Sequence, residues 1–176
     1  MRLSKRGEYG LRAMMMLADT QKPEGPYPVV QIKEISQREN IPAKFLEQIL
    51  LTLKNAGLLQ SKMGVGGGYY LARSPQEITL GHIERVLDGP LAPIRCVSQM
   101  AYEPCGCPDA ETCGLRMVMG DVRNAIASIL DQTTLAVEGR LEISGSWGQL
   151  LVYVIDRPGR SVPEAQVFMH PADATP

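Results

Sequence analysis

The residues best suited to chemistry in this sequence are its four cysteines, which all fall in one short stretch of the chain. Cys96, Cys105, Cys107 and Cys113 lie within eighteen residues of one another, and the sequence contains no other cysteine. The surrounding segment 91–114 carries several prolines and glycines, a composition that predicts a loop. Thiolates on one loop can converge on a metal centre in a way that a helix or a strand does not allow.

Clustered cysteines form disulfides in oxidising compartments and act as metal or redox ligands where thiols stay reduced. The sequence has no apolar run long enough to cross a membrane and no hydrophobic segment of a secretory signal peptide. We therefore expect a cytoplasmic protein whose cysteines are ligands.

Charge is distributed unevenly along the chain, although the net charge of −1 favours no partner. Residues 1–85 hold twelve Lys and Arg against eight Asp and Glu, whereas residues 86–176 hold six against eleven. A basic first half and an acidic second half indicate a nucleic-acid-facing end and a regulatory or assembly end.

The elements that would position the cysteine loop begin with a mainly helical first half. Ser4 is a suitable cap for a helix reaching Ala18, and a proline-rich linker follows over 22–28. A short helix is expected over 30–38, and a third runs from Pro42, in its first turn, to just before Gly57. The buried face of the third helix has the i, i+3, i+4, i+7 spacing of Leu46, Ile49, Leu50 and Leu53.

Two short helices separated by residues 39–41 predict a helix-turn-helix. Residues 58–62 and 69–72 are expected to form strands, joined by a turn over 64–68 with four glycines in five positions. A hairpin directly after the second helix is the wing of a winged helix. The turn could instead be a phosphate-binding loop, but neither the strand-to-helix order nor a Gly-Lys-Ser/Thr element is present.

A long amphipathic helix is expected after the cysteine loop, over 115–138. Its apolar residues repeat at alternating spacings of three and four, so this face must be buried on its own domain or on a second copy of the chain. We expect it to be the dimerisation helix, through Leu115, Val118, Val122, Ala125, Ile126 and Ile129. The predicted fold is mainly α: a winged helix-turn-helix with a small β-hairpin wing over 1–90, the loop 91–114 and the dimerisation helix.

Three stretches of the sequence resemble the Rrf-type winged-helix transcriptional regulators, a family that includes iron–sulfur and nitric-oxide-sensitive regulators. They are the opening 1–13, the recognition-helix stretch 41–58 and the wing 64–80. The resemblance covers about residues 1–138. It implies a homodimeric transcriptional repressor or activator, with repression favoured, that binds a partly palindromic double-stranded DNA operator. It does not imply an enzyme.

Polar side chains near the start of a recognition helix can read base edges, and basic residues around it can contact phosphates. For each basic residue, a solvated surface charge is the alternative interpretation. Many family members carry an arginine just before the wing glycines, where this chain has Met63, so Lys62 takes over that minor-groove contact or the contact is lost. The expected DNA-contacting residues are Arg2, Lys5, Arg12, Lys33, Lys44, Glu47, Gln48, Lys62, Gly66 and Gly67.

The resemblance also implies an iron–sulfur cluster, either 2Fe–2S or 4Fe–4S, held by three loop cysteines. Cys107 and Cys113 have the five-residue separation of the family's last two ligands, and Cys96 fits the first position. The histidine that serves as fourth ligand in one branch is replaced here by Arg116. Glu8 occupies the position of the acidic ligand that another branch donates across the dimer, and Cys105 is its competitor for the fourth place.

Other functions remain open at this level. The cysteines could bind zinc or act as redox thiols without a cluster, although the loop lacks the paired C-x-x-C spacing common in zinc sites. The chain could also be a small iron–sulfur redox protein whose winged helix binds a protein. The tail, 139–176, is expected to be largely disordered, with a strand over 150–155 as the alternative.

Overall fold

The computed structural model describes residues 3–20, 28–136, 155–156 and 160–161. The chain divides into two units, 1–135 and 136–176. In the second unit the described residues are two short antiparallel strands, β3 (Ile155–Asp156) and β4 (Arg160–Ser161). The expectations for the linker 22–28 and for the rest of the tail fall almost entirely outside the described residues.

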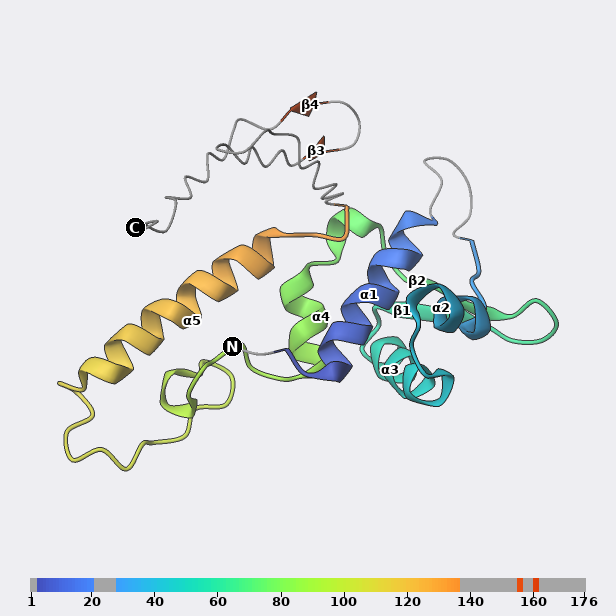
Figure 1. Ribbon diagram of the computed structural model, residues 1–176. Coiled ribbons are helices and arrows are strands. Elements are labelled where there is room, and N and C mark those ends of the chain that lie inside the picture. The colour runs from blue at the N-terminus through green and yellow to red at the C-terminus, as the bar shows by residue number, and fades with distance from the viewer. Residues whose placement is uncertain (1–2, 21–27, 137–154, 157–159, 162–176) are drawn as a thin grey trace, which may run out of the picture. The chain divides into compact units, whose positions relative to one another are not determined.

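The first helix, α1 (Lys5–Asp19), begins as the sequence predicts. Ser4 caps it by accepting hydrogen bonds from the amides of Arg6 and Gly7 at 3.1 and 3.0 Å. Helix α1 packs along α4 (Leu80–Leu87), as Figure 1 shows. A Cβ on Gly10 would clash with the side chain of Leu87, so glycine at this position permits the close approach of the two helices.

The helix-turn-helix consists of α2 (Ile32–Glu39) and α3 (Ala43–Asn55). Asn40 ends α2 with a left-handed backbone, φ 51°, which makes the tight turn between the helices. Pro42 is the N-cap of α3 and not part of its first turn. The predicted inner face of α3 is confirmed: Leu46, Ile49, Leu50 and Leu53 are fully buried in the core.

The predicted wing is confirmed as an antiparallel hairpin of β1 (Leu59–Lys62) and β2 (Gly68–Leu71), with Leu59 opposite Leu71. Val30 lies next to this hairpin and exchanges two backbone hydrogen bonds with Tyr69, at 2.9 and 2.8 Å. Helix α2 therefore starts at Ile32 and not at Val30, because the backbone of Val30 is already used in a strand-like bridge. A Cβ on Gly68 would clash with the carbonyl of Val30, so only glycine allows this approach.

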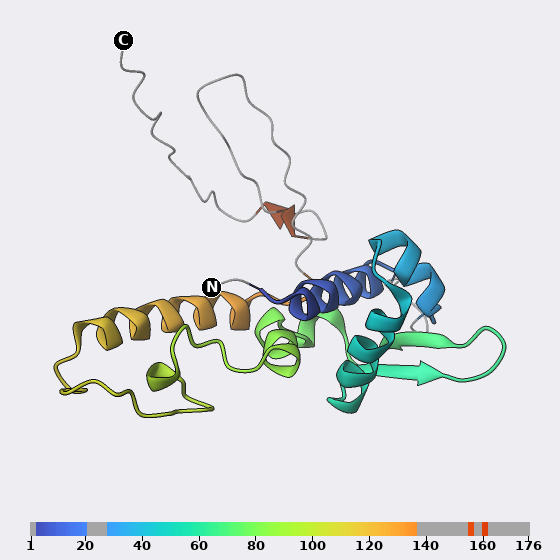
Figure 2. The same cartoon turned by 60° about the horizontal axis from the view of Figure 1, so that its bottom comes forward.

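The cysteine loop joins α4 to a long helix, α5 (Gly114–Gln132), which extends away from the winged helix in Figures 1 and 2. Arg85 of α4 forms a two-point ion pair with Asp131 of α5, at 2.5 and 2.8 Å. Helix α5 ends at Gln132, before position 138, because residues 133–135 turn back to pair with residues 78–80 through backbone hydrogen bonds of 2.9 Å.

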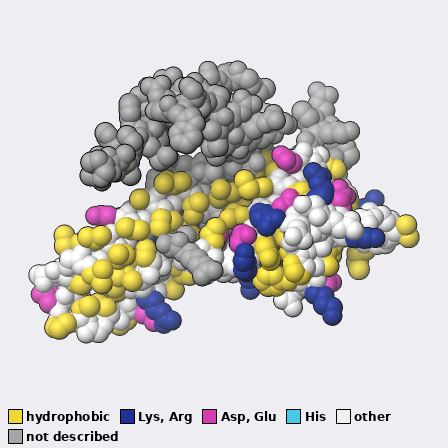
Figure 3. All heavy atoms as spheres, in the orientation of Figure 1, with side chains coloured by type: hydrophobic (Ala, Val, Ile, Leu, Met, Phe, Trp, Pro, Cys, Tyr) yellow, Lys and Arg dark blue, Asp and Glu magenta, His cyan; other side chains and the backbone are white. Residues whose placement is uncertain are grey.

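No residue of α5 is buried within the single chain. Figure 3 shows apolar side chains gathered along this helix, on the face of the molecule that it displays. Among them, Leu115 is 59% exposed and Ile129 is 64% exposed. Among the described helices, none has both the length and the apolar composition that a membrane span requires.

Candidate cysteine site and nucleic-acid interface

The cysteine loop presents its thiols from three different local structures. Cys96 is buried in a short 3-10 turn, Arg95–Val97, whereas Cys113 is half-buried at the N-cap of α5. Cys105 and Cys107 lie between them in extended chain, half-buried and exposed respectively. An ion pair of 2.5 Å between Arg95 and Glu103 closes the first part of the loop. All four cysteines are free thiols.

The thiols are electrostatic neighbours in chain order. Burial raises the pKa of Cys96, and the adjacent Cys105 thiol adds to this shift. The pKa of Cys105 is lowered, first by a hydrogen bond from the backbone amide of Cys107 and then by its side chain. Interactions with the thiols of Cys105 and Cys113 raise the pKa of Cys107 to about 11. Each sulfur therefore interacts with the next, which the linear sequence did not establish.

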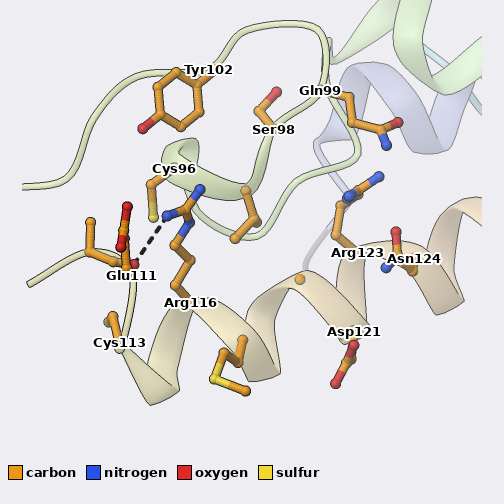
Figure 4. A pocket seen from close by; sticks show the side chains of 14 residues that line it. Cys96, Ser98, Gln99, Tyr102, Glu111, Cys113, Arg116, Asp121, Arg123 and Asn124 are labelled. Carbon is orange, nitrogen blue, oxygen red and sulfur yellow. Dashed lines mark hydrogen bonds between the residues drawn. The ribbon is translucent and has the colours of Figure 1, made fainter.

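A cavity of about 430 Å³ separates this loop from α5, and Cys96 and Cys113 both line it. Figure 4 shows Arg116 and Arg123 extending from α5 towards the loop. Arg116 donates a hydrogen bond of 3.1 Å to the carbonyl of Ala110, and its charge acts to lower the pKa of Cys96. From the sequence, Arg116 was considered only as the replacement of a histidine ligand, and Arg123 was not identified. Glu111 and Asp121 line the same cavity, so the two positive charges are accompanied by two carboxylates.

No three His, Cys, Asp or Glu side chains in the described part of the chain converge closely enough to hold a metal ion. The donor chemistry nevertheless fits an iron–sulfur cluster, since four free thiols follow one another as neighbours along the loop.

Glu8 lies on the first turn of α1 and lines a different cavity from that of Cys96 and Cys113. Its carboxylate contacts Lys5 at 2.8 Å and Arg12 at 3.7 Å, and the hydrogen bond from Lys5 lowers its pKa. Glu8 is thus held in the ionised form that a metal ligand requires. Ligation by Glu8 across the dimer stays a prediction.

The cavity that Glu8 lines is also lined by Glu84 of α4, a buried carboxyl group that was not predicted from the sequence. Glu84 is 2% exposed, and its Oε1 atom has no hydrogen-bond partner among the described residues. Burial raises its pKa, and Asp88, which binds the backbone amide of Ser4 at 3.0 Å, adds to the shift. The sequence did contain an indication that Glu84 is buried. It falls between Leu80 and Leu87 at the i, i+4, i+7 spacing of a buried helix face.

The variant Glu84→Gln is expected to stabilise the protein increasingly as the pH rises. The folded state holds the Glu84 proton more tightly than the unfolded state, whose pKa is near 4.5. The stability that this proton supplies is present below that pH and is lost as the pH rises through the higher folded pKa. Glutamine mimics the protonated acid at every pH. Urea unfolding midpoints should therefore be similar for variant and wild type near pH 4 and higher for the variant near pH 8.

Glu111→Gln is the control for this measurement, because Glu111 is exposed. The same pH dependence in that control, or a difference between Glu84→Gln and wild type that does not change with pH, would contradict the interpretation of Glu84.

The expected DNA-contacting surface is displayed by α3 and the wing. Lys44, Glu47 and Gln48 are exposed on the first turns of α3. A groove between the helix-turn-helix and the wing is lined by Lys33, Lys54 and Lys62, of which Lys54 was not predicted. In the wing turn, Gly66 is exposed and Gly67 half-buried.

The side chains of two other residues of the expected set form ion pairs with glutamates of the protein itself. Arg12 donates to Glu39, both to its side chain at 3.1 Å and to its carbonyl, and thereby links α1 to the end of α2. Lys5 pairs with Glu8 and lies 5.4 Å from the centre of the Tyr9 ring. Arg2 falls outside the described residues.

Comparison with known proteins shows what this arrangement is similar to. A model of the Rrf2 family, described as an iron-dependent transcriptional regulator, matches residues 3–137. A putative rrf2-like transcriptional regulator from Rhodobacter capsulatus is 37% identical over 134 residues, covering 76% of this chain and 89% of that protein.

Solved structures that share the fold include two regulators. CymR, the global cysteine regulator of B. subtilis, is 36% identical with a TM-score of 0.62, and the match covers 77% of this chain and 93% of that one. T. potens IscR is 34% identical with a TM-score of 0.59, and the match covers 77% and 84%. None of these relatives is named as an enzyme.

Proposed function

The chain belongs to the Rrf2 family of transcriptional regulators, and we propose that it binds a partly palindromic DNA operator as a homodimer under the control of an iron–sulfur cluster. Transcriptional regulation and a winged-helix fold come with membership of the family. The cluster, the homodimer and the form of the operator are the proposed parts.

One observation carries the proposal: every cysteine of the chain lies on the segment that joins the DNA-binding domain to α5. Cysteines that served only to stabilise the hydrophobic core would not be expected to cluster on a connecting loop. A relative named IscR shares the fold along most of the chain.

The proposed ligands are Cys96, Cys107, Cys113 and Glu8, the last from the second subunit, with Cys105 as the alternative for the fourth place. When bound, a cluster would supply an iron centre sensitive to redox state, to nitric oxide or to iron supply. A carboxylate ligand is harder than thiolate and more easily displaced, which suits a sensor better than a stable electron carrier.

The chain's own residues provide the link from the loop to DNA. The loop follows α4, and α4 packs on α1 and α3. A change in the conformation of the loop would therefore act through α4 on the position of α3, the recognition helix. The exposed apolar face of α5 is the surface on which two subunits would pair. Such a dimer would present two α3 helices to half-sites about 34 Å apart, one turn of DNA.

A thiol-based regulator is the second candidate. The neighbouring thiols of Cys105 and Cys107 favour it, because exchange with a small-molecule disulfide would oxidise them to a reversible disulfide and release that molecule as two thiols, without metal. CymR, named as a cysteine regulator, has the same fold. Zinc is a further possibility for the same thiols.

The first test is an absorption spectrum with iron and sulfide analysis on protein purified without oxygen, for wild type and Glu8→Ala. We expect stoichiometric iron and sulfide in wild type and a changed spectrum in the variant. The same samples should be titrated with duplexes selected from a random library, at several salt concentrations. Colourless protein that binds DNA, with zinc or no metal, would leave the thiol or zinc regulator; coloured protein without sequence-specific, salt-dependent binding would indicate a redox protein.

A further inference from the structure

The last turn of α5 is attached to α4 by an ion pair between side chains. Arg85 donates two hydrogen bonds to the carboxylate of Asp131, at 2.5 and 2.8 Å. A Cβ on Gly81 would clash with this carboxylate, so glycine at that position permits the contact. Among the described residues, no other side-chain hydrogen bond joins α5 to another helix. The Arg85–Asp131 pair is therefore the polar side-chain link between α5 and the DNA-binding domain.

The residues that follow α5 are attached to the DNA-binding domain through their backbone. The amide of Leu80 donates to the carbonyl of Thr133 at 2.9 Å. The amide of Leu135, whose side chain is buried in the core, donates to the carbonyl of Ile78 at the same distance. These contacts hold the chain beyond the helix, so they do not by themselves fix the angle of the helix. The ion pair adds this constraint, because a two-point pair of guanidinium and carboxylate fixes orientation as well as distance.

The angle at this attachment matters because the rest of α5 extends away from it, as Figures 1 and 2 show. Leu115, near the other end of the helix, lies ~24 Å from Asp131 along the axis, at about 1.5 Å per residue. A rotation of about 10° at the attachment would move that end by ~4 Å, close to the ~3.4 Å rise of one base pair. In a dimer that pairs along α5, such a rotation would change the separation of the two α3 helices by a comparable distance.

The pair stabilises the fold only slightly, because the side chains of Arg85 and Asp131 are 25% and 45% exposed and solvent screens their charges. Its effect on geometry is larger. We propose that the Arg85–Asp131 pair fixes the angle between α5 and the winged helix and thereby determines which spacing between operator half-sites the protein accepts. The separation of two recognition helices sets the half-site spacing that a dimer can bind. This inference rests on the proposed function, since it requires a homodimer on a partly palindromic operator.

The test uses full-length, anaerobically purified protein and its selected duplex, with the spacer between the half-sites shortened or lengthened by one base pair. Wild type is expected to bind the original spacing ~10-fold more tightly than either altered spacing. Arg85→Ala and Asp131→Ala should each reduce this preference to ~3-fold or less, and the double variant should lose no more than either, because both residues act through one pair. Gly81→Ala should have the same effect with both charges retained, since the added methyl group displaces the carboxylate of Asp131.

Gln132→Ala is the matched control, since it changes the exposed neighbour of Asp131, and it should keep the wild-type preference. A duplex with a single half-site checks folding, and every variant should bind it as wild type does. An unchanged spacing preference in Asp131→Ala and Gly81→Ala would overturn the inference. So would an equal loss on all duplexes for Arg85→Ala, which would identify a phosphate contact. Absence of sequence-specific binding by wild type would instead overturn the proposed function itself, so the two failures are distinguishable.

Discussion

Replacing Gln48 by alanine is expected to weaken binding to the preferred duplex by ~10- to 100-fold while leaving binding to unrelated DNA unchanged. Gln48 is exposed on α3, one helical turn after Lys44. A glutamine amide can donate to and accept from one adenine in the major groove. Its removal therefore costs base recognition without removing a phosphate contact.

Fluorescence anisotropy on labelled duplexes measures this directly, with the preferred sequence and a scrambled sequence compared at several salt concentrations. Gln132→Ala is the matched control, because it removes an exposed glutamine at the end of α5. Lys33→Ala should behave differently from both: affinity for both duplexes should fall together, and the salt slope should decrease by about one. An equal loss on both duplexes for Gln48→Ala would show that α3 does not read sequence through this residue.

The parts of the fold that the sequence predicted well are those determined locally. The spacing of Leu46, Ile49, Leu50 and Leu53 identified the buried face of α3, and Ser4 identified the start of α1. The glycine run 64–68 identified the wing turn, because positive φ angles at that turn require glycine. In these elements the residues that decide the structure lie within a few positions of one another.

The differences arise where distant residues meet. The start of α2 depends on Val30 pairing with Tyr69, a partner that no local pattern indicates. Arg12 has the charge of a phosphate contact, yet Glu39 of another helix binds its guanidinium. The buried state of Glu84 depends on the packing of α4 against α1. Charge and periodicity describe what a side chain can do, whereas its partner is set by tertiary packing.

In the candidate site, too, local features were predicted from the sequence and contacts between distant residues were not. The sequence placed all four cysteines on one loop, but it could not show that Cys96, in the turn before the loop's extended part, has Cys105 as its electrostatic neighbour. The sequence also did not predict that Arg116 and Arg123 face the loop. The pattern of polar and apolar residues in α5 does not indicate which face of the helix the loop covers.

Replacing Cys113 by alanine is expected to reduce the iron and sulfide content of anaerobically purified protein by at least ~10-fold, and Cys96→Ala and Cys107→Ala should do the same. Thiolates are the ligands on which an iron–sulfur cluster depends, and removal of one leaves an iron without a strong protein donor. Cys105→Ala should retain iron and sulfide, if Glu8 fills the fourth place.

Comparison of Cys105→Ala with Glu8→Ala decides between the two fourth ligands. Loss of a ligand changes the absorption spectrum, whereas loss of a bystander does not, so the spectrum reports the ligand even where iron content is partly retained. Glu111→Ala is the matched control for Glu8, since Glu111 lines the cavity of Cys96 and Cys113 without belonging to the proposed set. If Cys105→Ala alters the spectrum and Glu8→Ala does not, all four ligands come from one loop. Signalling would then have to travel within one subunit, through α4 to α3, and not through a tie between two subunits.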